Sequence, residues 1–108
     1  SGFDEFFVHN VLSGGAGCIG GLTNMCPELF VEWTKSLNAG NWDKVSEIQK
    51  KVNQLMEMFD ISAPFLTAVK RAMKIRGIIS NEYGRSPLVL ASDEEDAKIR
   101  QLLKDMDI

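Results

Sequence analysis

The residues best placed to do chemistry stand within the first two dozen positions of this sequence. Gly2 precedes an acidic pair, Asp4 and Glu5, and a glycine-rich segment follows at residues 14–21. Carboxylates can act as general acids or bases, and glycines let a ligand approach the backbone closely. We therefore expect this region to form one edge of a ligand site.

The acidic pair allows two interpretations. Adjacent residues on a helix point roughly 100° apart, so Asp4 and Glu5 do not form a paired carboxylate dyad. Acids in the first turn of a helix are also what the helix dipole favours. Gly2 favours the ligand interpretation, because a glycine lets a ligand come close to the backbone at the same place.

The segment from Gly15 to Gly20 matches the letters of a dinucleotide fingerprint, G-x-G-x-x-G. That motif works only when the glycines follow a strand and open a helix, so that a pyrophosphate meets the helix N-terminus. Here a helical pattern precedes the glycines, and the apolar step inside them is itself typical of a strand. We predict a tight helix-to-strand turn and no nucleotide site.

Other reactive side chains are sparse. Cys18, Cys26 and His9 have no metal-site spacing, and His9, the single histidine, has no partners in view with which to form a Ser/His/Asp or Cys/His arrangement. The sequence therefore predicts no metal and no cofactor. A basic stretch at residues 70–76 and an acidic run at residues 93–96 are interpreted as solvated or subunit-facing surface.

Composition limits the class of protein. The 108 residues, with 44% apolar and 25% charged side chains, suit one ordinary globular domain. A net charge of −3 provides no basic face for nucleic acid, and no apolar run approaches the roughly 18 residues needed to cross a membrane. Two free cysteines suit a reducing compartment, so we expect a cytoplasmic protein.

The predicted elements are mainly helical. Helical spacing covers residues 3–12, a glycine-bounded apolar run at 17–21 predicts one short strand, and the remainder is predicted as helices. These later helices start near Pro27, near Asn41, after Pro64 and, with a capping-box pattern, at Ser92. A seam that suits packing on another helix runs through Val45, Ile48, Val52, Leu55 and Phe59.

The lone strand has a structural consequence, because its backbone donors and acceptors need partners. A helix, one buried strand and another helix are typical of the last βα step of an α/β barrel. We therefore expect the chain to be part of a larger protein.

Two stretches resemble a known family. Ser1-Gly2, Asp4-Glu5, and then Gly15-Ala16-Gly17 with Ile19-Gly20 and Asn24 are similar to the C-terminal part of N-acetylneuraminate lyases. These lyases belong with dihydrodipicolinate synthases to a family of pyruvate-dependent class I aldolases. The similarity covers the whole chain but is specific mainly in residues 1–24.

The resemblance implies a (β/α)₈ TIM barrel with a helical extension. Residues 1–40 would be the last helix-strand-helix portion of the barrel, and residues 41–108 the extension. Barrel active sites lie at the C-terminal ends of the strands, where Gly2, Asp4, Glu5 and Gly21 would fall. The resemblance also implies a homo-oligomer, specifically a tetramer.

The resemblance further implies Schiff-base cleavage of a sugar acid to pyruvate and an aldehyde. The family's imine-forming lysine and proton-transferring tyrosine lie on earlier strands, so we expect no catalytic residue here and no activity of the chain alone. Gly2, Asp4 and Glu5 match positions that bind the hydroxylated tail of the substrate, and Ile19 matches a position that lines the keto-acid pocket. Gly21 stands where lyases carry a serine, which leaves sialic acid, another 2-keto sugar acid and dihydrodipicolinate-type chemistry open.

One alternative belongs to a different class of protein. The chain could be a self-standing helical interaction module that binds a partner through the seam from Val45 to Phe59. The barrel interpretation predicts poor stability or self-association of the chain alone, whereas the module predicts a cooperative melt.

Overall fold

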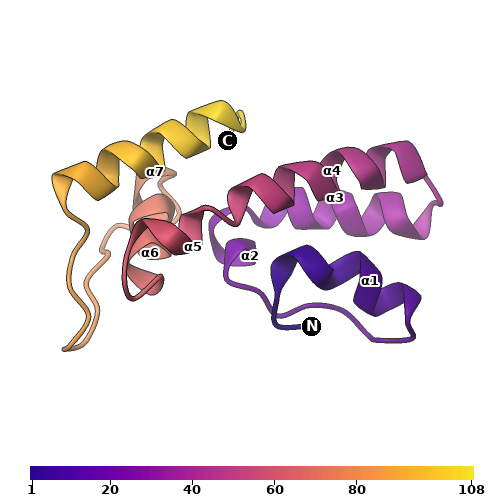
Figure 1. Cartoon of the computed structure of the whole chain (residues 1–108), viewed down its shortest axis with the longest axis horizontal. Coiled ribbons are helices and arrows are strands. Elements are labelled where there is room, and N and C mark those ends of the chain that lie inside the picture. Colours follow the sequence, from indigo (N-terminus) through magenta and orange to yellow (C-terminus); the bar gives the residue numbers. More distant parts are fainter. The chain divides into compact units, whose positions relative to one another are not determined.

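A computed structural model describes residues 1–108, and it consists of helices, turns and loops without a β-strand (Figure 1). The chain divides into two compact units, Ser1–Met56 and Glu57–Ile108. The expected boundary between residues 40 and 41 separates a barrel from its extension, and it stays a prediction. No helix is both long enough and apolar enough to cross a membrane.

The first unit contains a 3₁₀ turn followed by helices. Its elements are η1 (Asp4–Phe6), α1 (Phe7–Leu12), α2 (Leu22–Met25), α3 (Pro27–Asn38) and α4 (Trp42–Leu55). Pro27 occupies the first position of α3, where its missing N–H costs nothing. Asn41 caps α4, because its side chain accepts a hydrogen bond from the Lys44 amide at 3.2 Å.

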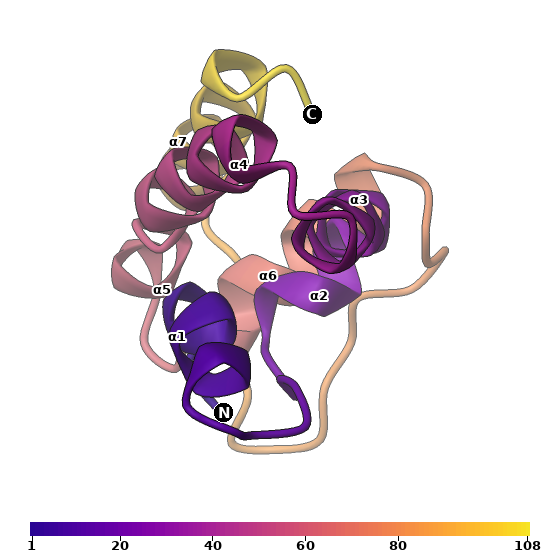
Figure 2. The ribbon, with the colours of Figure 1, turned by 90° about the vertical axis from the view of Figure 1, so that its right-hand side faces the viewer.

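The core of the first unit lies between α3 and α4, which run side by side (Figures 1 and 2). Trp33 is fully buried, and its indole Nε1 donates to the Val45 carbonyl at 3.1 Å. The rings of Phe7 and Phe30 meet Trp33 edge-on, with centroids 5.2 and 5.7 Å away. The predicted seam is therefore confirmed as a buried face from Val45 to Leu55, whereas Phe59 is only half-buried.

The strand predicted at residues 17–21 is wrong for this chain, because the segment is an extended loop between α1 and α2. The Ser1 nitrogen donates to the Gly17 carbonyl at 2.6 Å, and the Ile19 amide donates to the Ser1 carbonyl at 2.8 Å. These bonds flank Cys18 in the pattern that parallel strands use. A strand needs a longer ladder than this single step, and no other extended segment pairs with residues 17–21.

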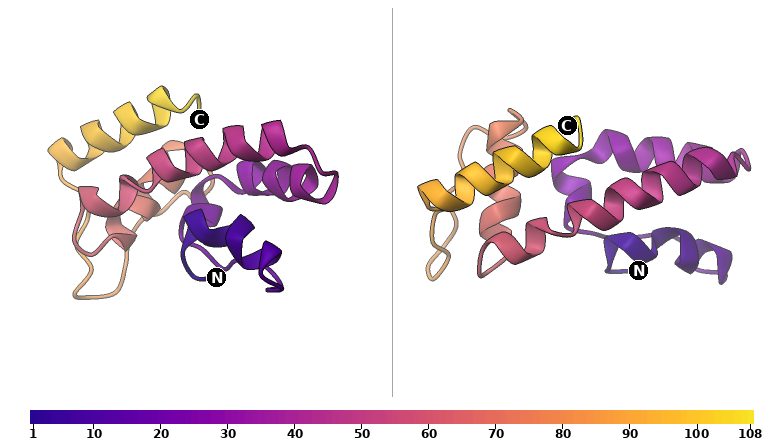
Figure 3. Two further views of the ribbon diagram at one scale, coloured as in Figure 1. Left: turned by 45° about the vertical axis from the view of Figure 1, so that its right-hand side comes forward. Right: turned by 45° about the horizontal axis from the view of Figure 1, so that its top comes forward.

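The second unit contains α5 (Met58–Ile61), α6 (Leu66–Ile75) and α7 (Asp93–Asp105), with a long loop between α6 and α7 (Figure 3). Ala68 and Ala72 on α6 and Ile99 on α7 are fully buried where these helices pack. The predicted capping box is confirmed, because the Glu95 amide donates to Ser92 Oγ at 3.1 Å and the Ser92 amide donates to Glu95 Oε1 at 2.9 Å.

Candidate functional site

The N-terminal segment and the glycine-rich loop lie together in the first unit. The two hydrogen bonds of Ser1 to residues 17–19 join them, and an open depression forms where they meet. Its lining is Ser1, Gly2, Ala16, Gly17, Cys18 and Ile19. Of the five predicted site residues, Gly2 and Ile19 therefore line one depression, and the Ile19 side chain is 93% exposed.

Asp4 is buried next to this depression and does not line it. Only 1% of the residue is exposed, and its Oδ1 accepts a hydrogen bond from the Leu22 amide at 3.2 Å. Oδ2 is buried and has no hydrogen-bond partner. Burial raises the pKa of this carboxyl, although hydrogen bonds from backbone amides, that of Leu22 foremost, oppose the rise.

Gly20 makes the room that Asp4 occupies. A Cβ atom at Gly20 would stand 2.0 Å from Asp4 Oδ1 and 2.5 Å from its Cγ, so no larger residue fits without moving the carboxyl. Sequence reasoning assigned the glycines to ligand approach and missed this pairing. Asp4 lies in η1 and Gly20 in the loop after α1, and residues sixteen apart carry no periodic signal that could have revealed the pairing.

Glu5 and Gly21 are neither fully buried nor part of the lining of the depression. Both are half-buried, and the Glu5 carbonyl accepts a hydrogen bond from Gln49 Nε2 at 2.9 Å, which ties η1 to α4. The Glu5 atom Oε2 is buried without a partner. Gly21 directly precedes α2. The structure thus brings all five predicted residues into one region, while their contact with substrate stays a prediction.

Reactive groups suited to nucleophilic catalysis are not assembled at this place. Every lysine of the chain lies on a helix, and no lysine is buried. Burial raises the pKa of the Cys18 thiol, and the nearby Asp4 charge raises it further, so the reactive thiolate is disfavoured. No group of three or more histidine, cysteine or acidic side chains is arranged to hold a metal ion.

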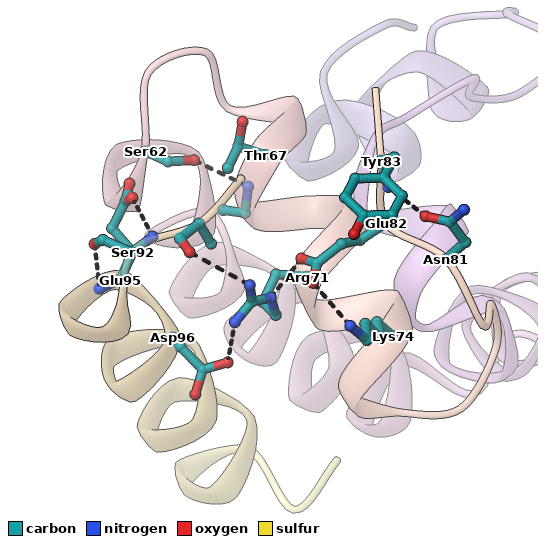
Figure 4. Close-up of polar contacts among 12 residues, drawn as sticks. Ser62, Thr67, Arg71, Lys74, Asn81, Glu82, Tyr83, Ser92, Glu95 and Asp96 are labelled. Atoms are coloured by element: carbon teal, nitrogen blue, oxygen red, sulfur yellow. Dashed lines mark hydrogen bonds and ion pairs between the residues drawn. The ribbon is translucent and has the colours of Figure 1, made fainter. Parts of the chain in front are cut away.

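A second polar cluster lies in the other unit (Figure 4). Arg71 on α6 pairs through Nε with Glu82 of the long loop, and through Nη1 with Asp96 of α7 at 2.8 Å. Lys74 pairs with the other oxygen of Glu82 at 3.0 Å, and Arg71 Nη2 also donates to the Ala91 carbonyl at 3.3 Å. These cations are neutralised, so the cluster joins the loop to two helices and offers no open anion site.

Sequence reasoning missed this cluster. The basic stretch at residues 70–76 is not only solvated or subunit-facing surface, because Arg71 and Lys74 both pair with the buried Glu82. Glu82 stands in a loop without any periodic pattern, so only the folded structure reveals its partners.

Solved structures with the same arrangement identify the class of protein. The YagE protein of E. coli K12, whose structure is in complex with pyruvate and which belongs to the dihydrodipicolinic acid synthase family, matches with a TM-score of 0.92. The match covers 98% of this chain and 36% of YagE at 23% identity, and it shows the shared fold. A monomeric dihydrodipicolinate synthase variant matches with a TM-score of 0.84 at 30% identity, covering 99% of this chain and 35% of that protein.

The fold is therefore that of part of a dihydrodipicolinate synthase-like TIM-barrel protein. The profile of the dihydrodipicolinate synthetase family matches residues 1–106. This chain belongs to the dihydrodipicolinate synthetase family.

Relatives within this family carry lyase and aldolase names. A DapA-like lyase of Thermococcus kodakarensis is 31% identical over 95% of this chain. A probable 2-dehydro-3-deoxy-D-pentonate aldolase of E. coli K12, YjhH, is 29% identical over 94%, and the 4-hydroxy-tetrahydrodipicolinate synthase of Thermotoga petrophila is 34% identical over 97%. The chain spans about a third of the length of these relatives, 34% to 35%.

Proposed function

We propose that this chain is the C-terminal portion of a Schiff-base-forming aldolase that cleaves a sugar acid, similar to N-acetylneuraminate, into pyruvate and an aldehyde. The observation that carries the proposal is the shared depression of Gly2 and Ile19, with Glu5 and Gly21 nearby and no lysine lining it. The chain contributes substrate contacts, and the imine-forming lysine and the tyrosine come from residues outside it.

The names of the relatives support a 2-keto acid as substrate. One relative is named as a probable aldolase of a 2-dehydro-3-deoxy sugar acid, and another as a 4-hydroxy-tetrahydrodipicolinate synthase. YagE was solved with pyruvate, the keto-acid fragment that such a cleavage releases. Gly21 supplies no side-chain hydroxyl, which favours a sugar acid with a shorter or less polar tail than sialic acid.

Partners and compartment belong to the same proposal. The enzyme acts in the cytoplasm without a cofactor, metal, nucleic acid or membrane, and it assembles as a homo-oligomer, a tetramer by its family resemblance. One solved relative is described as monomeric, so light scattering on the full-length protein is the direct test of assembly.

The interaction-module alternative has lost its main support. Val45, Ile48, Val52 and Leu55 are buried within the chain, and α4 packs on α3. A buried face cannot also receive a partner helix, so no specific observation favours the module.

The test is the activity of the full-length protein that carries this chain. We expect it to release pyruvate from 2-keto-3-deoxy sugar acids, measured with lactate dehydrogenase and NADH. In parallel, N-acetylneuraminate tests the cleavage of sialic acid, and the condensation of pyruvate with aspartate semialdehyde tests dihydrodipicolinate-type chemistry. The proposal fails if no 2-keto sugar acid is cleaved while pyruvate still condenses with aspartate semialdehyde.

A further inference from the structure

The side chain of Asp4 supports the turn that carries the predicted pocket residues. Its carboxyl lies against Gly20, where a Cβ atom would come within 2.0 Å, and it accepts a hydrogen bond from the amide of Leu22. Leu22 is the first residue of α2, so this bond fixes the point where the loop becomes helix. Ile19 and Gly21 flank Gly20 on the same turn.

The burial of Asp4 conflicts with the role of a substrate contact. With 1% of its surface exposed, its carboxyl cannot meet a substrate hydroxyl unless the turn at residues 20–22 opens. Further protein packed on this unit can only reduce that exposure. Gly2 and Ile19, in contrast, face the open depression.

We infer that Asp4 is a positioning residue, whose buried carboxyl holds the 20–22 turn and so places Ile19 and Gly21 on the wall of the substrate site. Gly2 and Glu5 are then left to meet the hydroxyl groups of the substrate. This inference rests on the proposed function, and it separates Asp4 from the substrate-binding role that the family resemblance implies.

The experiment compares Asp4→Asn, Asp4→Ala and Gly20→Ala in the full-length protein, with Asp43→Asn as a control at an exposed aspartate. Two substrates are used: a 2-keto-3-deoxy sugar acid, and 4-hydroxy-2-oxopentanoate, which lacks the hydroxylated tail. Borohydride trapping of bound pyruvate counts the competent sites, so that kcat is expressed per competent site and is independent of the folded fraction.

The expected results follow from geometry. Asp4→Asn keeps an acceptor for the Leu22 amide, so kcat/KM stays within about twofold of the wild type for both substrates. Asp4→Ala removes the acceptor and Gly20→Ala displaces it, so kcat per trapped site falls about tenfold for both substrates alike.

Two kinetic results would overturn the inference. If Asp4→Asn raises KM about tenfold for the sugar acid alone, Asp4 touches the hydroxylated tail. If Asp4→Ala matches the wild type per trapped site, Asp4 supports folding without positioning the site.

Hydrogen exchange separates this inference from the proposed function. Amides of residues 17–25 should exchange faster in Asp4→Ala and Gly20→Ala than in Asp4→Asn, and this measurement needs no substrate. If the wild type cleaves no sugar acid, the proposed function fails and the exchange data still decide whether Asp4 holds the turn. Unchanged exchange in Asp4→Ala would overturn the inference.

Discussion

Glu82 lies between two cations, and its side chain is only 6% exposed. Arg71 reaches it from one side and Lys74 from the other, and Arg71 continues to Asp96. Hydrogen bonds to charged groups are stronger than neutral ones, and removing one partner of a buried pair leaves the other uncompensated. This residue therefore contributes more to stability than a surface acid does.

Replacing Glu82 with alanine should lower the free energy of unfolding by about 2 kcal/mol, because Arg71 and Lys74 lose their shared partner. Urea denaturation followed by circular dichroism measures the loss. The matched control is Glu47→Ala, which removes a surface pair with Lys44 whose acid side chain is 52% exposed. We expect no measurable change there. Equal losses in both variants would contradict a special role for Glu82.

The same cluster predicts a loss of stability in acid. Arg71 holds the pKa of Glu82 below its usual 4.5 and the pKa of Asp96 below its usual 3.8. In acid the unfolded chain therefore binds more protons than the folded chain. The stability that these two carboxylates contribute is fully present above their usual pKa values, and it is lost as the pH falls through their lowered pKa values in the folded chain. Asp4 acts with the opposite sign, because its raised pKa makes the folded chain bind its proton more readily.

Urea midpoints measured from about pH 7 to about pH 3 test this linkage. The double variant Glu82→Gln with Asp96→Asn should lose less stability in acid than the wild type does. Asp4→Asn should steepen the acid loss, because it removes a contribution that grows as pH falls. If the wild type, the double variant and Asp4→Asn lose stability in parallel as the pH falls, Glu82, Asp96 and Asp4 do not cause the acid dependence.

At the scale of elements, the helices were predictable where local chemistry defines them. Asn41, Pro27 and Ser92 each mark a helix start in the sequence, and the structure places α4, α3 and α7 there. The seam on α4 was predictable because apolar residues repeat with helical spacing. The 3₁₀ turn η1 and the short α2 were not, because four residues or fewer carry too little periodicity.

The capping box of α7 gives a test at this scale. Ser92→Ala removes the acceptor for the Glu95 amide, so the free energy of unfolding should fall by about 1 kcal/mol. Ser80→Ala in the exposed loop is the control, and thermal unfolding by circular dichroism is the measurement. Ser92→Thr should recover much of the loss, whereas a full loss in that variant would argue against capping.

The location of the candidate site was predictable from the sequence, whereas the role of each residue in it was predictable only in part. Glycines and acids in the first two dozen residues marked the place, because both residue types are visible in the sequence. The burial of Asp4 against Gly20 was not predictable, since it depends on a contact between residues sixteen positions apart, with α1 between them. The strand at residues 17–21 failed for a related reason: its pattern indicates burial among neighbouring strands, and such neighbours are not present in this chain.

At the scale of the whole molecule, the placement of the lysines bears on what the chain can do alone. An imine-forming lysine needs a desolvated or cation-flanked amine, so that it loses its proton near neutral pH. No lysine here is buried, and the hydrogen bonds that the Lys44 ammonium donates to Glu47 and Glu32 raise the pKa of Lys44, which opposes that chemistry. All of them lie on helices: Lys35, Lys44, Lys50, Lys51, Lys70, Lys74, Lys98 and Lys104.

The chain of 108 residues should therefore form no imine with pyruvate. Incubation with pyruvate and borohydride, followed by intact-mass spectrometry, should leave its mass unchanged. The full-length protein, treated in the same way, should gain one reduced pyruvate adduct, and peptide mapping should place it on a lysine outside this chain. A stable, stoichiometric adduct on one of the eight helical lysines would instead show that the chain carries its own catalytic amine.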